Sequence, residues 1–128
     1  MFVDIFSEEK ISAGEELTKY LDRAQLEVSA SLWFYVTDLN AWRLIIASPE
    51  VRIYGPKNLY KKIQSVISKL PDDKKIALKD IAVVDNNDPL ILLLRTAIKT
   101  GKVISGIRFS RNTINGVFIE DAYIYRII

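Results

Sequence analysis

Residues 103–128 read VISGIRFSRNTINGVFIEDAYIYRII, with one alternating run on each side of Asn115-Gly116. A type I′ turn requires positive φ at both of its central residues, and an Asn-Gly pair adopts that conformation at little cost. Two alternating runs around such a pair predict a β-hairpin. Counting outward from the turn places Phe109 opposite Ala122.

The two faces of this predicted hairpin differ in chemistry. One face is mostly apolar, as expected for a strand pair that covers a core. The other face carries Arg108, Ser110, Asn112, Asp121, Tyr123 and Tyr125. It is more polar than a hairpin inside a core needs, so we expect it to line a ligand site or a protein interface. Arg108, Tyr123 and Tyr125 are the candidate interface residues.

The last residues of the hairpin, 123–128, are apolar and favour a strand. We expect this strand to lie at an edge of the sheet. An exposed edge pairs readily with another strand unless it is covered. The sequence therefore predicts self-association through this hairpin.

Three helical patterns and three strand patterns precede the hairpin. The helices are expected from Ser12, from Pro56 to Leu70 and after Asp88, and the strands at 28–36, 42–48 and 80–84. Ser12 stands three residues before Glu15, which is the spacing of a capping box, and Ser7 is the alternative start. Asp88 caps the third helix and Gly101 takes the left-handed position after its end. That helix is apolar almost all round, which predicts that it is the most buried of the three.

The resulting order is α-β-β-α-β-α-β-β within a single domain over residues 1–128. Strand-helix-strand connections favour parallel pairing, so the second, third and fourth strands are expected to run parallel. The predicted fold class is α/β, with a mixed α+β arrangement as the alternative. In either case three helices pack on a five-stranded mixed sheet.

The amino-acid composition excludes several kinds of chemistry. The 128 residues include no cysteine and no histidine, which removes disulfides, thiol nucleophiles and the usual general base near neutral pH. The five glycines are scattered, so no phosphate-binding loop can be assembled from them. No apolar run is long enough to span a membrane, and Asp4 argues against a signal peptide. A cytoplasmic protein without membrane or cofactor is expected.

Ligands in open α/β sheets usually bind beyond the carboxyl ends of the parallel strands. Polar side chains follow all three ends that we expect here. The candidate rim residues are Glu50, Asp85, Asp88, Ser110, Arg111, Asn112 and Asp121. As an alternative, Glu50, Asp85 and Asp88 could hold Mg²⁺ while Arg111 holds a phosphate, which would suit phosphodiester cleavage.

The second helix suggests a further alternative, the binding of nucleic acid. Residues 51–80 contain eight bases and three acids, a balance of +5, whereas residues 1–27 contain three bases and seven acids, a balance of −4. The candidate phosphate contacts are Lys57, Lys61, Lys62 and Lys69. A solvated helix face explains the same lysines and is the favoured interpretation.

The leading hypothesis is a small cytoplasmic domain without catalytic activity, which works through protein association as a homo-oligomer or with a partner protein. The Mg²⁺-dependent phosphodiester-cleaving enzyme and the nucleic-acid-binding module are its two alternatives.

Overall fold

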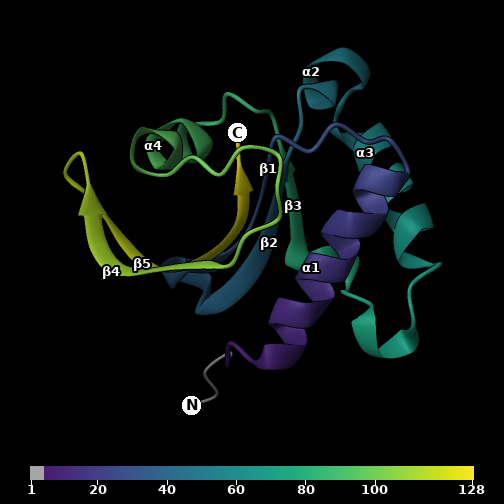
Figure 1. Cartoon of the computed structure of the whole chain (residues 1–128), viewed down its shortest axis with the longest axis horizontal. Coiled ribbons are helices and arrows are strands. Elements are labelled where there is room, and N and C mark those ends of the chain that lie inside the picture. Colours follow the sequence, from purple (N-terminus) through teal and green to yellow (C-terminus); the bar gives the residue numbers. More distant parts are fainter. Residues whose placement is uncertain (1–4) are drawn as a thin grey trace.

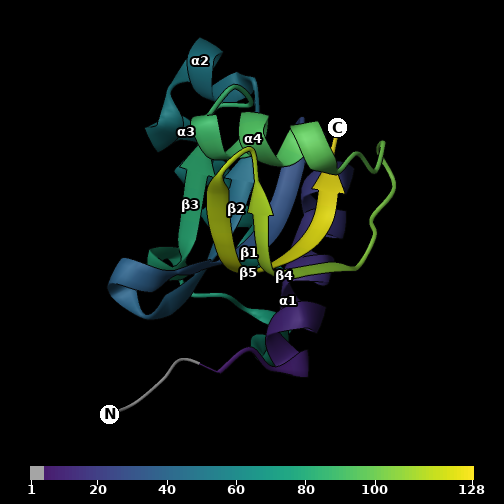
Figure 2. The same cartoon turned by 90° about the vertical axis from the view of Figure 1, so that its left-hand side faces the viewer.

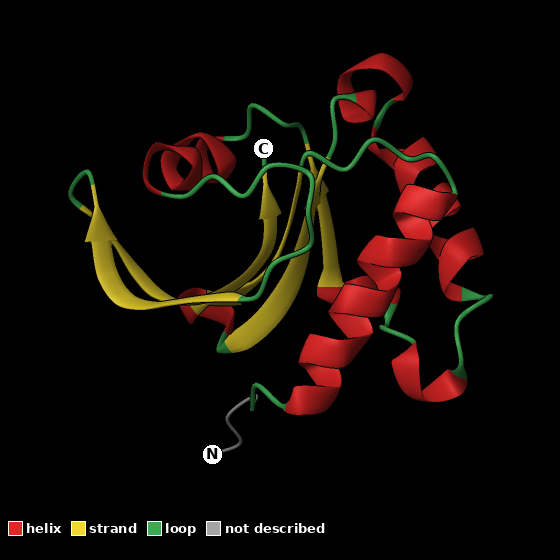
Figure 3. Ribbon diagram, in the orientation of Figure 1, coloured by secondary structure: helices red, strands yellow, loops and turns green. Residues whose placement is uncertain are grey.

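The computed structural model describes residues 5–128, and Asp4, used above against a signal peptide, lies outside them. A five-stranded mixed sheet with helices on it is confirmed (Figure 3). The described part contains four α-helices rather than three, because a short helix precedes the one expected from Pro56. The helices are α1 (Glu8–Arg23), α2 (Glu50–Tyr54), α3 (Pro56–Ile67) and α4 (Pro89–Ala97). The strands are β1 (Ala30–Val36), β2 (Ala41–Ala47), β3 (Ile81–Val84), β4 (Ile107–Ile114) and β5 (Val117–Ile127).

The strand order is β3-β2-β1-β5-β4, and only β2 and β3 pair in parallel. The prediction that the fourth strand joins them in the same direction is wrong. β5 runs antiparallel to β1, and the tight hairpin makes β4 antiparallel to β5, so β4 points opposite to β2 and β3. The chain crosses from one edge of the sheet to the other through α4, and the rule for crossovers between parallel strands does not apply.

The expected edge position of the last strand is also wrong. β5 lies between β1 and β4, and β4 forms the edge. The loop before β4 also bonds to the end of β5, where the amide of Ser105 donates to the carbonyl of Tyr125 at 2.6 Å. The near-continuous apolar run at the end of β5 is therefore typical of a central strand. In a strand that is covered on both faces, polar residues no longer alternate with apolar ones.

The hairpin turn itself is confirmed. Asn115 and Gly116 have φ of 48° and 80°, and Phe109 pairs with Ala122. The hairpin bends at Arg111, whose φ is also 48°. Beyond this bend, the residues of β4 that face the core change from odd-numbered to even-numbered positions. Asn112 therefore pairs with the buried Ile119 and does not lie on the polar face where we expected it.

Two apolar cores lie on opposite faces of the sheet. The helices α1 and α3 cover one face, and α4 lies in the hollow of the bent hairpin on the other (Figure 1). Seen from the hairpin side, α4 crosses the ends of the strands (Figure 2). The first core is centred on Leu17, Trp33 and Leu59, and the second on Leu32 and Ile91.

The first helix begins earlier than the capping-box spacing predicted. Ser7 is the N-cap, because its hydroxyl accepts a hydrogen bond from the amide of Lys10 at 3.3 Å, and two glutamates follow in the first turn. Gly14 is therefore inside α1, where a Cβ would overlap Tyr125 Oη and Trp33 Nε1. The absence of a side chain at Gly14 lets the helix lie directly on the sheet.

The helix α4 differs from its prediction in two ways. It ends at Ala97 rather than continuing to Gly101, and Ile98 is already extended. Only Ile91 and Leu94 are fully buried in it, whereas Leu92 is 45% exposed. The most buried helix is α1, because α1 lies across the centre of the sheet and α4 faces solvent on its outer side. None of the helices within residues 5–128 is both long and apolar enough to cross a membrane.

Candidate functional site

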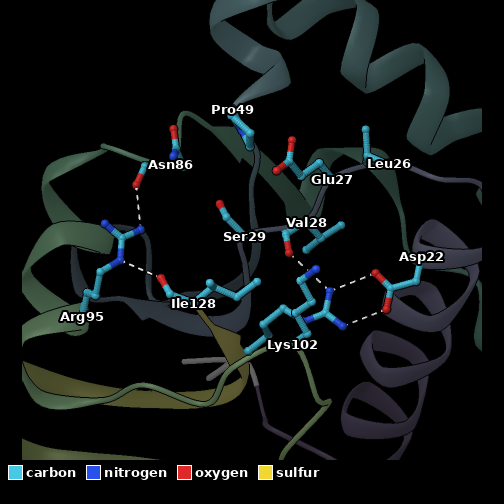
Figure 4. Close-up of a pocket in the computed structure, with 11 residues that line it drawn as sticks. Asp22, Leu26, Glu27, Val28, Ser29, Pro49, Asn86, Arg95, Lys102 and Ile128 are labelled. Atoms are coloured by element: carbon cyan, nitrogen blue, oxygen red, sulfur yellow. Dashed lines mark hydrogen bonds and ion pairs between the residues drawn. The ribbon is translucent and has the colours of Figure 1, made fainter.

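The carboxyl ends of three strands meet at one rim of the sheet, as expected, but one of the strands is different. β2 ends before Ser48 and β3 before Asp85, and β5 replaces β4 as the third strand of this rim. A cavity of about 710 Å³ opens there, which we call the rim cavity (Figure 4). It is lined by Asp22, Leu26, Glu27, Val28, Ser29, Pro49, Asn86, Arg95, Lys102, Arg126 and Ile128.

Two arginines build the walls of the rim cavity. Arg126 on β5 donates to both carboxylate oxygens of Asp22 on α1, at 2.9 and 2.7 Å, and to the carbonyl of Val28 at 3.3 Å. Arg95 on α4 donates to the main-chain oxygens of Ile128 and Asn86, at 2.8 and 3.0 Å. Figure 4 shows Arg95 and Asp22 on opposite sides of the cavity. The cavity therefore has preformed walls tied to three different elements.

Some polar groups of this cavity have no partner within residues 5–128. Arg126 is only 5% exposed, and its Nε atom makes no hydrogen bond. The side-chain oxygen of Asn86 is also buried and unpaired. A buried polar atom without a partner costs about 1–3 kcal/mol. Lys102 is an exposed residue, and no carboxylate of the described chain pairs with it.

The three rim carboxylates that formed the candidate Mg²⁺ site each have another partner. Glu50 accepts from the amide of Glu27 at 2.8 Å and pairs with Lys62 at 3.2 Å. Asp88 caps α4 by accepting from the amide of Leu90 at 3.0 Å. No group of three or more acidic side chains suited to a metal ion occurs within residues 5–128.

Asp85, the third of these carboxylates, pairs with Arg52 at 2.8 Å. The hydrogen bond from that guanidinium holds the pKa of Asp85 below its usual value, and burial opposes the shift only in part. This carboxylate is therefore stabilised as the anion by a neighbouring arginine, in a pair at the outer surface.

The polar face of the final hairpin borders a second hollow, of about 520 Å³, which we call the hairpin groove. Its lining residues are Phe6, Tyr35, Trp42, Arg108, Ser110, Arg111, Glu120 and Asp121. Four of the predicted polar residues therefore lie together, with aromatic side chains contributed by the first hairpin and the segment before α1. Asn112 lies outside the groove.

Arg108 is held firmly within this groove. Its guanidinium lies 5.1 Å from the ring centroid of Phe6 and 5.8 Å from that of Trp42, which are cation–π distances. It also donates to both oxygens of Asp121, at 2.6 and 2.5 Å. This charged partner raises the pKa of Arg108, and burial opposes the rise. Arg111, by contrast, has no hydrogen bond or ion pair on its guanidinium within residues 5–128.

Of the two candidate interface tyrosines, only Tyr123 lies on the same face as Arg108, which is its cross-strand partner. Tyr125 is a core residue, 1% exposed, whose hydroxyl donates to the carbonyl of Ile11 at 2.6 Å. It points toward α1 because β5 has a register shift opposite Ser31. Tyr123 is half-buried and packs against Phe6, with ring centroids 5.7 Å apart. Tyr125 is therefore removed from the candidate interface.

The candidate nucleic-acid lysines lie on and after α3. Lys57, Lys61 and Lys69 are exposed, whereas Lys62 pairs with Glu50 and lies over the ring of Tyr54. Tyr60, the nearest aromatic residue on the helix, accepts a hydrogen bond at 3.0 Å from the amide of Val83 and is half-buried. The surface therefore offers positive charge with one exposed tyrosine ring, which Lys62 already covers.

The sequence predicted a site at the strand ends, where the rim cavity lies, but it predicted none of the residues that line this cavity. Arg126 gave one signal, because a charged residue within the apolar run 123–128 needs a buried partner. Nothing in the sequence connected it with Asp22 or Lys102. A comparison of the chain with protein-family models, curated proteins and solved structures found no match.

Proposed function

We propose that this protein is a non-catalytic domain that binds a partner protein along β4 and the hairpin groove. The observation that carries the proposal is the composition of this surface, where Arg111 stands unpaired beside the aromatic side chains of the groove. Protein interfaces are enriched in arginine and aromatic residues, which provide most of the binding energy. Val117 and Phe118 at the hairpin tip extend the surface with exposed apolar side chains, 47% and 57% exposed.

The edge position of β4 adds a second argument. β5 bonds to one side of β4, and no strand within residues 5–128 pairs with the other side. An extended segment of another protein would add a strand there through main-chain hydrogen bonds, and the neighbouring side chains would provide specificity.

The charge of β4 favours an acidic partner over a second copy of the chain. The strand Ile107–Ile114 contains two arginines and no acidic residue, so a second copy of this strand would offer no carboxylate to pair with Arg111. A partner strand with Asp or Glu would instead neutralise Arg111. The self-association expected from the sequence assumed that apolar β5 lies at the edge, and the structure places it inside the sheet.

A selection from a displayed library of extended peptides tests the proposal. We expect the wild-type protein to enrich peptides with Asp or Glu and with β-branched residues. The variant Arg111→Glu should enrich Lys and Arg instead, and Arg111→Ala should lose the charge preference. Hydrogen exchange should show new protection of the β4 amides when a selected peptide is bound.

Two outcomes would contradict this function. One is a selection that enriches no peptide, or that enriches the same peptides with Arg111→Glu as with the wild type. The other is a stable dimer in light scattering over a range of protein concentrations, which would assign the β4 surface to a second copy. We expect a monomer in that measurement.

A further inference from the structure

The rim cavity shares no lining residue with the hairpin groove, and its chemistry is different. We infer that it binds a small organic anion, a carboxylate or phosphate ester of at most nucleotide size, whose anionic group contacts Lys102 and Arg95. This inference is independent of the protein-association function, because neither surface contains a residue on which the other depends.

The size and lining of the cavity fit a small molecule. Its volume of about 710 Å³ is within the range of about 300–1,000 Å³ that is typical of ligand sites. Leu26, Val28, Pro49 and Ile128 contribute apolar surface, and Ile128 is 43% exposed there. Such sites combine apolar walls with a few polar groups that orient the ligand.

The charge of the lining favours an anion. Three basic and two acidic side chains line the cavity, and Asp22 is used by Arg126. Arg95 bonds to two main-chain oxygens, and within residues 5–128 no side-chain carboxylate pairs with Arg95 or Lys102. These two cations thus retain donors for a carboxylate or phosphate group, which arginine binds especially well through its planar fork.

A binding panel with matched variants tests the inference. Thermal unfolding and calorimetry are measured with inorganic phosphate, citrate, benzoate and adenosine monophosphate, and with uncharged adenosine, each at millimolar concentration. We expect at least one anion to raise the melting temperature and adenosine to have no effect. If phosphate and adenosine monophosphate both bind, the ligand group is a phosphate. If citrate or benzoate binds instead, the ligand group is a carboxylate.

The variants assign the binding to this cavity. Lys102→Gln should weaken binding about tenfold, the loss of one charged contact. Lys99→Gln removes the same charge from an exposed position outside the lining and should leave binding unchanged. Arg111→Glu should also bind the anion as the wild type does, even if it abolishes the peptide selection.

The inference is overturned if no anion of the panel raises the melting temperature. It is also overturned if Lys102→Gln and Lys99→Gln weaken binding equally, since that would indicate a response to overall charge. A chemical-shift titration that moves the amides of Asn86 and Lys102 with the anion, and leaves those of the groove unchanged, would support it.

Discussion

Arg126 on β5 and Asp22 on α1 are 104 positions apart in the chain and form two hydrogen bonds, of 2.9 and 2.7 Å. The side chain of Arg126 is 6% exposed. A charge so deeply buried is tolerated when a well-placed partner compensates its lost hydration. This pair therefore joins the last strand to the first helix and forms one wall of the rim cavity.

Replacement of Asp22 by Asn should destabilise the protein markedly. Arg126 would retain its charge in a buried position without its anionic partner, and we expect the free energy of unfolding to fall by about 2 kcal/mol. Urea denaturation measures this change. Glu16→Gln, which breaks the exposed pair of Glu16 and Lys19, is the control and should cost less than about 0.5 kcal/mol. Equal effects of the two variants would show that Asp22 does not compensate Arg126.

Replacement of Gly14 by Ala should destabilise the protein, although alanine is the better helix former by about 1 kcal/mol. The new Cβ would overlap Tyr125 Oη and Trp33 Nε1, and overpacking of this kind costs about 1–3 kcal/mol. The same substitution made in a Tyr125→Phe background should cost less, because the closest atom is then absent. A double-mutant cycle by urea denaturation measures the coupling, and additive effects would show that the contact is unimportant.

Tyr125 should make the stability depend on pH above about pH 10, the usual pKa of a tyrosine. Burial raises the pKa of the Tyr125 phenol in the folded protein. Above the unfolded value the unfolded chain loses this proton while the folded chain keeps it, so stability falls as the pH rises, by about 1.4 kcal/mol per pH unit from this group. Urea denaturation at alkaline pH should show a smaller decline for Tyr125→Phe than for the wild type. Identical declines would contradict this assignment.

The two arginines of the hairpin groove should respond differently to truncation. Arg108→Ala removes the cation–π contacts and the ion pair with Asp121, and because the side chain is half-exposed we expect a loss of about 1 kcal/mol. Arg111→Ala should change stability by less than about 0.5 kcal/mol, because its guanidinium has no partner within residues 5–128. Thermal unfolding compares the two variants. A larger loss from Arg111→Ala would reverse the assigned roles.

The correct sequence predictions depend on neighbours along the chain. Asn115-Gly116 predicts the hairpin because the turn requires positive φ within the pair itself. Asp88 predicts the start of α4 because a cap bonds to the amide two residues later. The capping-box spacing at Ser12 misled, because the N-cap is Ser7, which has no Glu or Gln three residues later but has Glu8 and Glu9 in the first turn.

The direction of β4 and the place of β5 in the sheet follow from contacts between distant segments. A strand-helix-strand pattern is compatible with return to a neighbouring strand or with passage to the far edge, and the pairing of β5 with β1 selects the second. The bent hairpin likewise curves around α4, with Arg111 at positive φ, and neither feature was predicted from the sequence.

The sequence contains enough information for the five strands, three of the four described α-helices, the turn and the mixed sheet, because propensities, caps and periodicity act over a few residues. The sites depend on the assembled sheet. Strand order places the end of β5 at the same rim of the sheet as the ends of β2 and β3, where the rim cavity opens and Arg126 pairs with Asp22. The same order leaves β4 unpaired at the edge with Arg111 beside the groove. Burial and unpaired polar atoms are properties of contacts between segments far apart in the chain, and these arise only on folding.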